Sequence, residues 1–395
     1  GFSERAYPSL YREPSLTIEG RTYYVDTASW TFGYINVIEI CDDPVFANGY
    51  GECTLADMMI NSYYHGSEST LWNVVETKQR SIHIIDSDGA IAEKIPIVRA
   101  PGVTAYISIM YGCNNFCSYC IVPYVRGRER SRAPEEIIEE IKKQVADGVI
   151  EVMLLGQNVN SYGKNLDNPI SFAELLRRVE EIEGLQRIRF MTSHPKDLSD
   201  ELIEVMKHSK KICRHLHLPL QAGDDGVLEA MHRPYNTEQY RQELARIRAA
   251  VPGIAISTDL MVGFPGETDE QFENSLAFAD EMAFSGMHLF QYSPREGTPA
   301  ATYPVQVRNE VKAERSKRMH EVAEKNANAF MEQHLGQVVD VLIEEPHGDT
   351  AWSGHTDNYL HVVVEEDGHH ALGRNQTVQV YLEAIDGKIM KGKIY

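Results

Sequence analysis

Residues 105–120, AYISIMYGCNNFCSYC, place three of the chain's six cysteines directly after a run of apolar residues. The run 105–110 has the continuous apolar character of a strand in a parallel sheet that is buried on both faces. Cys113, Cys117 and Cys120 follow at Cys-x3-Cys-x2-Cys spacing, so one loop can direct three thiolates to a common point. The stretch therefore predicts a metal centre at the end of a strand.

The number of ligands indicates which metal this loop holds. A structural zinc site needs four ligands, but no fourth cysteine lies nearby and the nearest histidines, His83 and His194, are far along the chain. A 4Fe–4S cluster held by three thiolates keeps one iron open. We therefore expect an iron–sulfur cluster, with zinc and free buried cysteines as the alternatives.

Further along the chain, short apolar segments alternate with amphipathic segments of helical period. Strands are expected at 152–155, 187–191, 215–220, 254–262 and 287–292, and helices at 134–146, 172–182, 201–208, 237–250 and 270–283. With the first strand they form six β/α units, which predict an α/β fold with a parallel sheet. Six units fit a partial (β/α)6 barrel whose chemistry lies at the C-terminal ends of the strands.

This regular pattern covers only the middle of the chain, which suggests three domains. Residues 1–100 read as an irregular α/β domain plus a linker, with strand-like stretches at 21–26 and 81–85. Residues 101–336 hold the β/α units and end in a long polar helix at 307–335. Residues 337–395 alternate with period two at 338–343, 359–364 and 377–382, which predicts a small all-β barrel.

Composition narrows the class of protein. The 395 residues, 43% of them apolar, are typical of a globular protein with more than one domain. The net charge of −20 argues against a protein that coats nucleic acid non-specifically, and is compatible with a local basic site. No apolar run is long enough to span a bilayer and no signal peptide is visible, so we expect a cytoplasmic protein outside the membrane.

The sequence around the cysteines is similar to one family. The stretch 107–132, ISIMYGCNNFCSYCIVPYVRGRERSR, resembles the radical S-adenosylmethionine (SAM) methylthiotransferases. Further support comes from LLGQNVNSY at 154–162, TSHPKD at 192–197, HLPLQAG at 217–223, DLMVGFPGET at 259–268 and YSPREGT at 292–298. The chain is most similar to the branch that modifies N(6)-dimethylallyladenosine in tRNA. The threonylcarbamoyladenosine branch is the closest competitor, because GHTDNY at 354–359 suits it too.

The resemblance implies cofactors, partners and roles for particular residues. It implies a radical SAM transferase that adds a methylthio group to a modified adenosine next to the tRNA anticodon. Cys113, Cys117 and Cys120 would ligate a 4Fe–4S cluster, and Tyr119 would lie against the adenine of SAM. Gln157, Ser193 and Gln221, at or just beyond strand ends, are expected to contact SAM or, alternatively, to cap the next helix. The partners implied are a tRNA substrate, an electron donor such as flavodoxin or ferredoxin, and a sulfur donor of unknown identity.

Two regions are candidates for contact with RNA. The arginines that follow the cysteine loop suit phosphate recognition or form a solvated face paired with nearby glutamates: Arg126, Arg128, Arg130 and Arg132 against Glu129, Glu135 and Glu136. Residues 337–395 resemble the TRAM domain, a β-barrel that the family uses on RNA. Within it, Trp352 and Tyr359 either stack on bases or belong to the core. His215 and His217 share one face of their strand and line the cavity or pack in the core.

The N-terminal region departs from the family pattern. Family members carry three more cysteines there, which hold a second 4Fe–4S cluster linked to sulfur insertion. The first is missing from 28–33, Tyr63 stands where the second is expected, and Cys41 and Cys53 match neither position. A second cluster therefore lacks its ligand set. The alternatives are a radical SAM enzyme without sulfur insertion and a non-catalytic RNA-binding or zinc protein.

Overall fold

The computed structural model describes residues 15–18, 21–26, 39–41, 91, 102–348, 350–365 and 371–395. The chain divides into two compact units, Gly1–Ala100 and Pro101–Tyr395. In the first unit, β1 (Ser15–Ile18), β2 (Arg21–Asp26) and β3 (Glu39–Cys41) form an antiparallel sheet. The strand expected at 21–26 is confirmed. The strand expected at 81–85, the stretch 28–33 and Tyr63 lie outside the described residues, whereas Cys41 ends β3.

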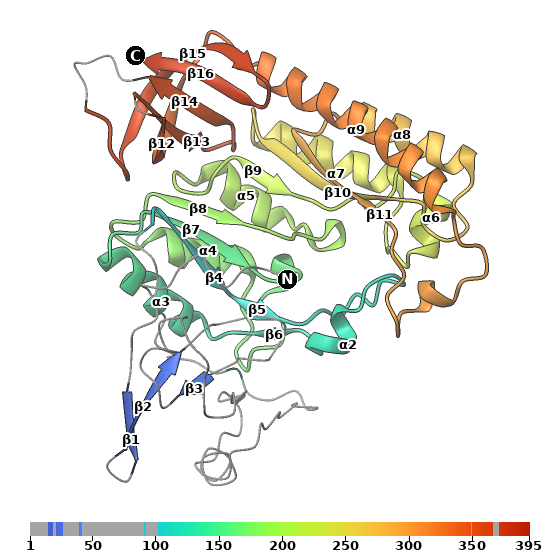
Figure 1. Ribbon diagram of the computed structural model, residues 1–395, viewed down its shortest axis with the longest axis horizontal. Helices are drawn as coiled ribbons and strands as arrows, with labels where there is room; N and C mark the ends of the chain where they lie inside the picture. The colour runs from blue at the N-terminus through green and yellow to red at the C-terminus, as the bar shows by residue number, and fades with distance from the viewer. Residues whose placement is uncertain are drawn as a thin grey trace. The chain divides into compact units, whose positions relative to one another are not determined.

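The second unit is built on two three-stranded parallel sheets (Figure 1). One contains β4 (Thr104–Ser108), β7 (Glu151–Leu155) and β8 (Arg187–Phe190); the other contains β9 (His215–His217), β10 (Ala255–Val262) and β11 (Gly286–Gln291). A parallel bridge between Ile188 and Ile212 joins the two sheets. No pairing joins β4 to β11 among the described strands, so the expected α/β architecture of six parallel strands in an open arrangement is confirmed.

Helices connect these strands at the expected places. They are α3 (Pro134–Ala146), α4 (Phe172–Glu180), α5 (Asp200–His208), α7 (Thr237–Ala250) and α8 (Asp269–Met282), and the long helix α9 (Asn309–Glu332) follows. Local sequence explains where two of them begin. Asn236 with Gln239 and Thr268 with Gln271 form reciprocal capping boxes, which satisfy otherwise unpaired backbone N–H groups.

The strands present two different faces. Apolar residues such as Ile107, Leu154 and Ile188 belong to one continuous core with the helices. Ionisable residues alternate with them on the opposite, inner face: Glu151, Arg187, Arg189, His215, His217, Asp259 and His288. Because side chains alternate across a strand, the same strands build both the core and a polar interior.

The C-terminal part is a closed β-barrel, as expected. Its strands pair in the order β12 (Val338–His347), β13 (Ala351–Thr356), β14 (His361–Glu365), β16 (Ile389–Ile394) and β15 (Thr377–Asp386), and β15 pairs again with β12. A separate core fills it, with Val341, Val362 and Val380 at its centre. Closure removes the exposed sheet edges that so small a domain would otherwise present.

Candidate functional site

The three clustered cysteines lie on a loop whose two ends are held together. The short strands β5 (Met110–Tyr111) and β6 (Arg130–Ser131) pair antiparallel at its base. Just above this base, the amide of Cys113 donates to the carbonyl of Gly127 over 3.2 Å. The loop, which contains helix α2 (Val122–Arg126), therefore starts directly beyond the C-terminal end of β4.

The middle of the loop is fixed by Ser118, which is fully buried. Its hydroxyl donates to the carbonyl of Ala230 (2.8 Å), its amide donates to Met231, and its carbonyl accepts from Ala300. Because Ser118 lies between Cys117 and Cys120, these three bonds hold both cysteines against the body of the fold. The loop is thus built as a rigid platform, which suits residues that must converge on one ligand.

Burial controls the chemistry of the cysteine thiols. Cys113 and Cys117 are buried and Cys120 is half-buried. Desolvation raises the pKa of Cys113 to about 11, and it also raises the pKa of Cys120. Both thiols are therefore protonated near neutral pH, and a metal that binds them must displace protons.

Arg233 lies beside one of these cysteines. Its Nη1 is 3.3 Å from Sγ of Cys117, and its Nη2 donates to the carbonyl of Pro219. Nε donates to the hydroxyl of Tyr235 (2.8 Å), which itself donates to the carbonyl of Leu220. Arg233 is therefore a permanent positive charge directed at the sulfur of Cys117. Sequence reasoning missed it, and its position after helix α6 (Asp225–Ala230) gives no local signal.

Unpaired polar atoms gather at the C-terminal ends of β7 and β8. Within the described residues, Gln157 Oε1, Ser193 Oγ and His194 Nε2 are buried without a hydrogen-bond partner, as are both side-chain polar atoms of Asn160. Burial, followed by the charges of Arg233 and Lys196, lowers the pKa of His194 to about 2, so this imidazole is neutral. Unpaired buried polar atoms are costly, which indicates a polar ligand here.

These strand ends lie close to the cysteine loop. Lys196, two residues after His194, donates a hydrogen bond to the side chain of Asn115 in the loop. The rings of His194 and Tyr235 are 5.7 Å apart in an edge-to-face contact. The structure thus brings Gln157 and Ser193, expected from the sequence, to the same edge of the fold as the thiols. It adds Asn160 and His194, which the sequence analysis did not single out.

The two other expected SAM contacts are placed differently. Gln221 is buried and has a positive φ of 71°, and its backbone pairs with Asp259 and Met261 on β10. Tyr119 is half-buried against the main core, and burial raises the pKa of its hydroxyl well above the usual value. The contacts of Gln221 and Tyr119 described here are made with the protein itself. Their roles toward SAM therefore stay predictions.

The donor set fits a cluster better than a single ion. Two sulfurs bound to one tetrahedral zinc ion lie about 3.8 Å apart, given Zn–S bonds of ~2.3 Å. Among the described residues, the groups of three ligand atoms within 4.8 Å of one another do not include the three cysteines. Three thiols on one rigid loop, spaced more widely than a single ion requires, suit the larger 4Fe–4S cluster.

The four arginines expected to face RNA do not lie in equivalent places. Arg132 is buried, where its Nη1 donates to the carbonyl of Ser108 and to Glu140, both at 2.7 Å. This guanidinium stabilises the fold, so its expected role in RNA binding is replaced by a structural one. Arg128 stacks over the ring of Phe116, 4.4 Å from the ring centre. Arg126 and Arg130 stay candidates by position alone.

The C-terminal barrel contacts the inner face where the strands begin. Arg187 donates to the carbonyls of His355 (2.7 Å) and Asp340, and Arg189 donates to those of Thr356 and Asp357. Tyr359 makes a second set of contacts between the barrel and the strands. Its ring stacks on that of His215, with the ring centres 4.9 Å apart, and lies under the guanidinium of Arg189. Tyr359 therefore joins the two domains, whereas Trp352 packs on the core of the barrel.

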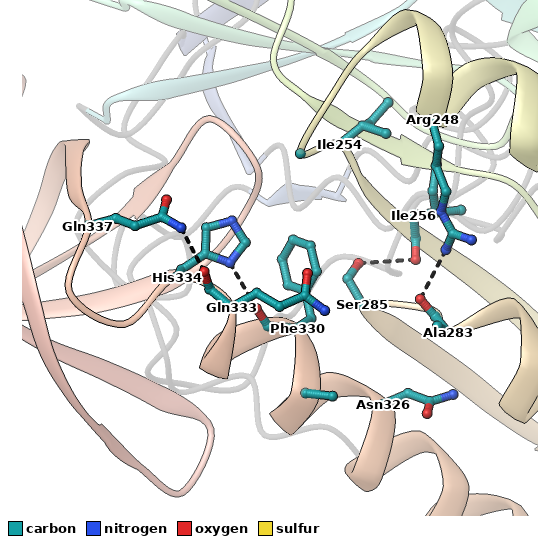
Figure 2. Close-up of a pocket in the computed structure, with 12 residues that line it drawn as sticks. Arg248, Ile254, Ile256, Ala283, Ser285, Asn326, Phe330, Gln333, His334 and Gln337 are labelled. Carbon is teal, nitrogen blue, oxygen red and sulfur yellow. Dashed lines mark hydrogen bonds between the residues drawn. The ribbon is translucent and has the colours of Figure 1, made fainter.

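A pocket of about 450 Å³ lies at the opposite end of the strands from the cysteine loop. Figure 2 shows it between the start of β10, the turn before β11 and the end of α9. Arg248 on its wall donates to the carbonyls of Met282 and Ala283, which end helix α8. The one arginine that lines the pocket is thus hydrogen-bonded to the backbone of the protein itself. None of the residues that line the pocket belongs to the candidate metal-binding residues.

Comparison with known proteins adds family evidence. Residues 107–279 match the model of the Radical SAM superfamily. The chain is 52% identical over 269 residues to the tRNA-2-methylthio-N(6)-dimethylallyladenosine synthase of Lachnoclostridium phytofermentans, covering 68% of this chain and 59% of the relative. The enzyme of the same name from Caldicellulosiruptor saccharolyticus is 50% identical over 280 residues, covering 71% and 59%. The chain therefore spans about three fifths of the length of these relatives.

Among solved structures, one similar protein is the radical SAM methyltransferase of Kitasatospora setae with cobalamin and a [4Fe–4S] cluster bound. It is 17% identical, with a TM-score of 0.43, and the match covers 55% of this chain and 43% of that one. None of the described helices is both long and apolar enough to cross a membrane.

Proposed function

We propose that this chain is a radical SAM methylthiotransferase that adds a methylthio group to a modified adenosine next to the anticodon of tRNA. Residues 107–279 match the Radical SAM superfamily model, and relatives at about 50% identity carry a tRNA methylthiotransferase name. N(6)-dimethylallyladenosine is the favoured substrate, since the relatives at about 50% identity carry that name. The observation that carries the proposal is the rigid three-cysteine loop, which faces unpaired polar atoms at the neighbouring strand ends.

In this proposal Cys113, Cys117 and Cys120 hold a 4Fe–4S cluster. When bound, the cluster supplies an open iron that binds SAM and an electron that cleaves it. The protein's own contribution is to place the reactants. Ser193 and Gln157 have free hydrogen-bonding capacity at the strand ends, which suits the polar groups of SAM.

The surroundings of the thiols support the same assignment. Arg233 offers a hydrogen bond and a positive charge to the sulfur of Cys117, which stabilises electron density on that ligand. His194 is neutral and buried, so it binds a polar group without adding charge to the site. Burial of the loop keeps water away from reactive intermediates, which is the main protective task of a radical enzyme.

We assign the RNA contacts to two places. Arg126, Arg128 and Arg130 border the cysteine loop, and guanidinium groups there suit the phosphates of a tRNA loop. The closed barrel β12–β16 is assigned as a TRAM-type RNA-binding domain on the basis of its sequence resemblance. A flavodoxin or ferredoxin is the expected electron donor, and the cytoplasm is the expected compartment.

The first test is metal and product analysis after anaerobic reconstitution. We expect about four irons and four sulfides per chain, and release of 5′-deoxyadenosine on reduction with SAM present. Cys117→Ala should lose both signals, while Cys213→Ala, a buried cysteine outside the loop, should keep them. Colourless protein that binds zinc on the three thiols would contradict the assignment.

The second test identifies the substrate and the alternatives. The chain is expressed in a strain that lacks its own tRNA methylthiotransferases, and tRNA nucleosides are analysed by mass spectrometry. A methylthio mark on N(6)-dimethylallyladenosine supports the proposal, and one on threonylcarbamoyladenosine supports the competing branch. Cleavage of SAM without any methylthio mark would assign a radical SAM enzyme without sulfur insertion, as the unmatched N-terminal cysteines suggest.

A further inference from the structure

A second group of metal-ligand side chains lies on the inner face of the sheet, away from the cysteines. His217 on β9, Asp259 on β10 and His288 on β11 come from three adjacent strands. One ligand atom from each lies within 4.8 Å of the other two. Strand pairing explains the convergence, because Asp259 is directly opposite His288 in the register and His217 is opposite Ser257, two residues away on the same face.

The separations between these atoms fit the ligands of one metal ion. Oδ1 of Asp259 is 3.4 Å from Nε2 of His217 and 3.2 Å from Nδ1 of His288, the second at hydrogen-bond distance. Two ligands bound ~2.1 Å from a tetrahedral zinc ion are separated by about 3.4 Å. A zinc ion can therefore be bound here with small shifts of these side chains.

The hydrogen bond made by the other ring nitrogen of His217 also suits a metal. Nδ1 of His217 is 3.0 Å from the hydroxyl of Ser257, which can accept a hydrogen bond from Nδ1–H and so leave Nε2 unprotonated as a ligand. Such outer hydrogen bonds commonly orient the histidines of zinc sites.

The group is also accessible and incomplete. The side chain of His217 is 3% exposed and that of Asp259 is 24% exposed, whereas that of His288 is 59% exposed. His288 therefore provides both an entry path and the freedom to adjust its distance. Two histidines and one carboxylate leave a fourth position open, which is the pattern of zinc sites that bind water or a substrate atom.

We propose that His217, Asp259 and His288 form a binding site for a single zinc-class divalent cation on the inner face of the sheet. The site is separate from the cysteine loop, and the proposal does not depend on SAM cleavage or on tRNA as a substrate. Its open coordination position can bind a nitrogen or oxygen atom of a ligand.

The test measures zinc directly on the full chain, with the iron–sulfur cluster reconstituted. Protein is equilibrated with buffered free Zn²⁺ between 1 nM and 10 μM, and bound zinc is counted by elemental analysis. Wild type should take up one zinc per chain in this range. His288→Asn and Asp259→Asn should each weaken binding at least 100-fold. The control His208→Asn removes an exposed histidine paired with Glu204 on α5 and should change nothing.

Zinc-edge X-ray absorption then identifies the ligands, whether or not the cluster has formed. Nitrogen and oxygen neighbours near ~2.0–2.1 Å with imidazole scattering support the site, whereas sulfur near ~2.3 Å would place the zinc on the cysteines and overturn it. Absence of uptake by wild type at 10 μM, or equal uptake by both variants, would also overturn it and leave a hydrogen-bonded triad. Circular dichroism checks that each variant is folded.

Discussion

At the scale of single residues, the contact between Arg233 and Cys117 places a positive charge beside a sulfur that we propose as a ligand of the iron–sulfur cluster. A cation near a ligand sulfur stabilises the reduced, more negative state of an iron–sulfur cluster. The guanidinium is held in place by Tyr235 and by the carbonyl of Pro219, so it cannot easily turn away from the sulfur. Its effect should therefore be visible in a spectroscopic property and not only in turnover.

Replacing Arg233 with Gln should lower the midpoint potential of the cluster by about 65–110 mV, the equivalent of a charged hydrogen bond of ~1.5–2.5 kcal/mol. Arg233→Lys should recover part of the loss, because it restores the charge. The measurement is a redox titration followed by electron paramagnetic resonance. Arg241→Gln, which removes an arginine that pairs with Glu281 on the surface, is the control and should leave the potential unchanged.

His215 predicts a dependence of stability on pH. Burial, followed by the positive charges of Arg189, His217 and His288, lowers the pKa of His215 to about 3. Its ring contacts Ser257 and Tyr359, so the folded state keeps it neutral. An unfolded chain takes up a proton near pH 6.5, so the stabilisation is present above that pH and is lost progressively as the pH falls toward 3.

We expect the free energy of unfolding of the wild type to decrease between pH 6.5 and pH 5. His215→Gln should reduce that slope by up to about 1.4 kcal/mol per pH unit, the contribution of one proton. Urea denaturation at several pH values measures it. A slope that is unchanged in the variant would show that His215 titrates normally in the folded protein.

At the scale of single elements, the cysteine loop depends on one glycine conformation. Gly112 has a φ of 74°, and a Cβ at this position would lie 2.1 Å from the carbonyl oxygen of Arg128. Backbone would have to move to relieve that clash, since no flexible side chain is involved. The consequence is a displaced Cys113, the next residue along the chain.

Gly112→Ala should therefore reduce iron loading by at least half while the protein remains folded. Gly253→Ala is the matched control, because Gly253 has a similar φ of 76° but open space around it. That control carries the cost of the left-handed conformation, about 1 kcal/mol, without the clash. Iron per chain after reconstitution is the measurement, and equal loading of the two variants would refute a steric role for Gly112.

The regular helices and strands could be predicted because, in each of them, the spacing of apolar residues and the length of the segment indicate the same type of element. The bounds of α3 and α7 match the expected ranges, and all six parallel strands lie where apolar runs were found. Strands β13 and β16 were not expected, since a glycine interrupts the alternation in each: Gly354 in one and Gly392 in the other. Helix α6 was missed because six residues are too short to show a period.

The candidate site was predictable only where residue type and spacing carry the signal. Three cysteines on one loop are visible in any single sequence, whereas Arg233 meets Cys117 across more than a hundred residues. The group of His217, Asp259 and His288 depends on strand register, which pattern alone does not determine. Arg132 shows that position in a basic run can also mislead. The sequence pattern predicted an exposed arginine, but the structure buries this side chain.

At the scale of the whole second unit, two arginines of β8 attach the C-terminal barrel through its backbone carbonyls. Arg187 is buried and donates to backbone carbonyls of two barrel strands, His355 of β13 and Asp340 of β12, while Arg214 makes a longer, exposed contact of 3.7 Å with Asp357. Buried hydrogen bonds from a charged donor contribute more than surface ion pairs, which are worth about 0–1 kcal/mol. The domain connection should therefore depend on Arg187 far more than on Arg214.

Arg187→Met should lower the stability of the domain contact by about 2–4 kcal/mol, because it removes two charge-assisted hydrogen bonds to the carbonyls of His355 and Asp340. Hydrogen exchange monitored by mass spectrometry should show faster exchange in residues 353–360. Arg214→Met, the exposed counterpart, should exchange like the wild type. Identical exchange in both variants would show that the contact does not depend on this arginine.

Tyr359 connects the barrel to two strands through one side chain. Its ring stacks on His215 of β9 and lies under the guanidinium of Arg189 of β8, although 46% of the residue is exposed. A change at Tyr359 therefore alters the surroundings of both strands at the same time.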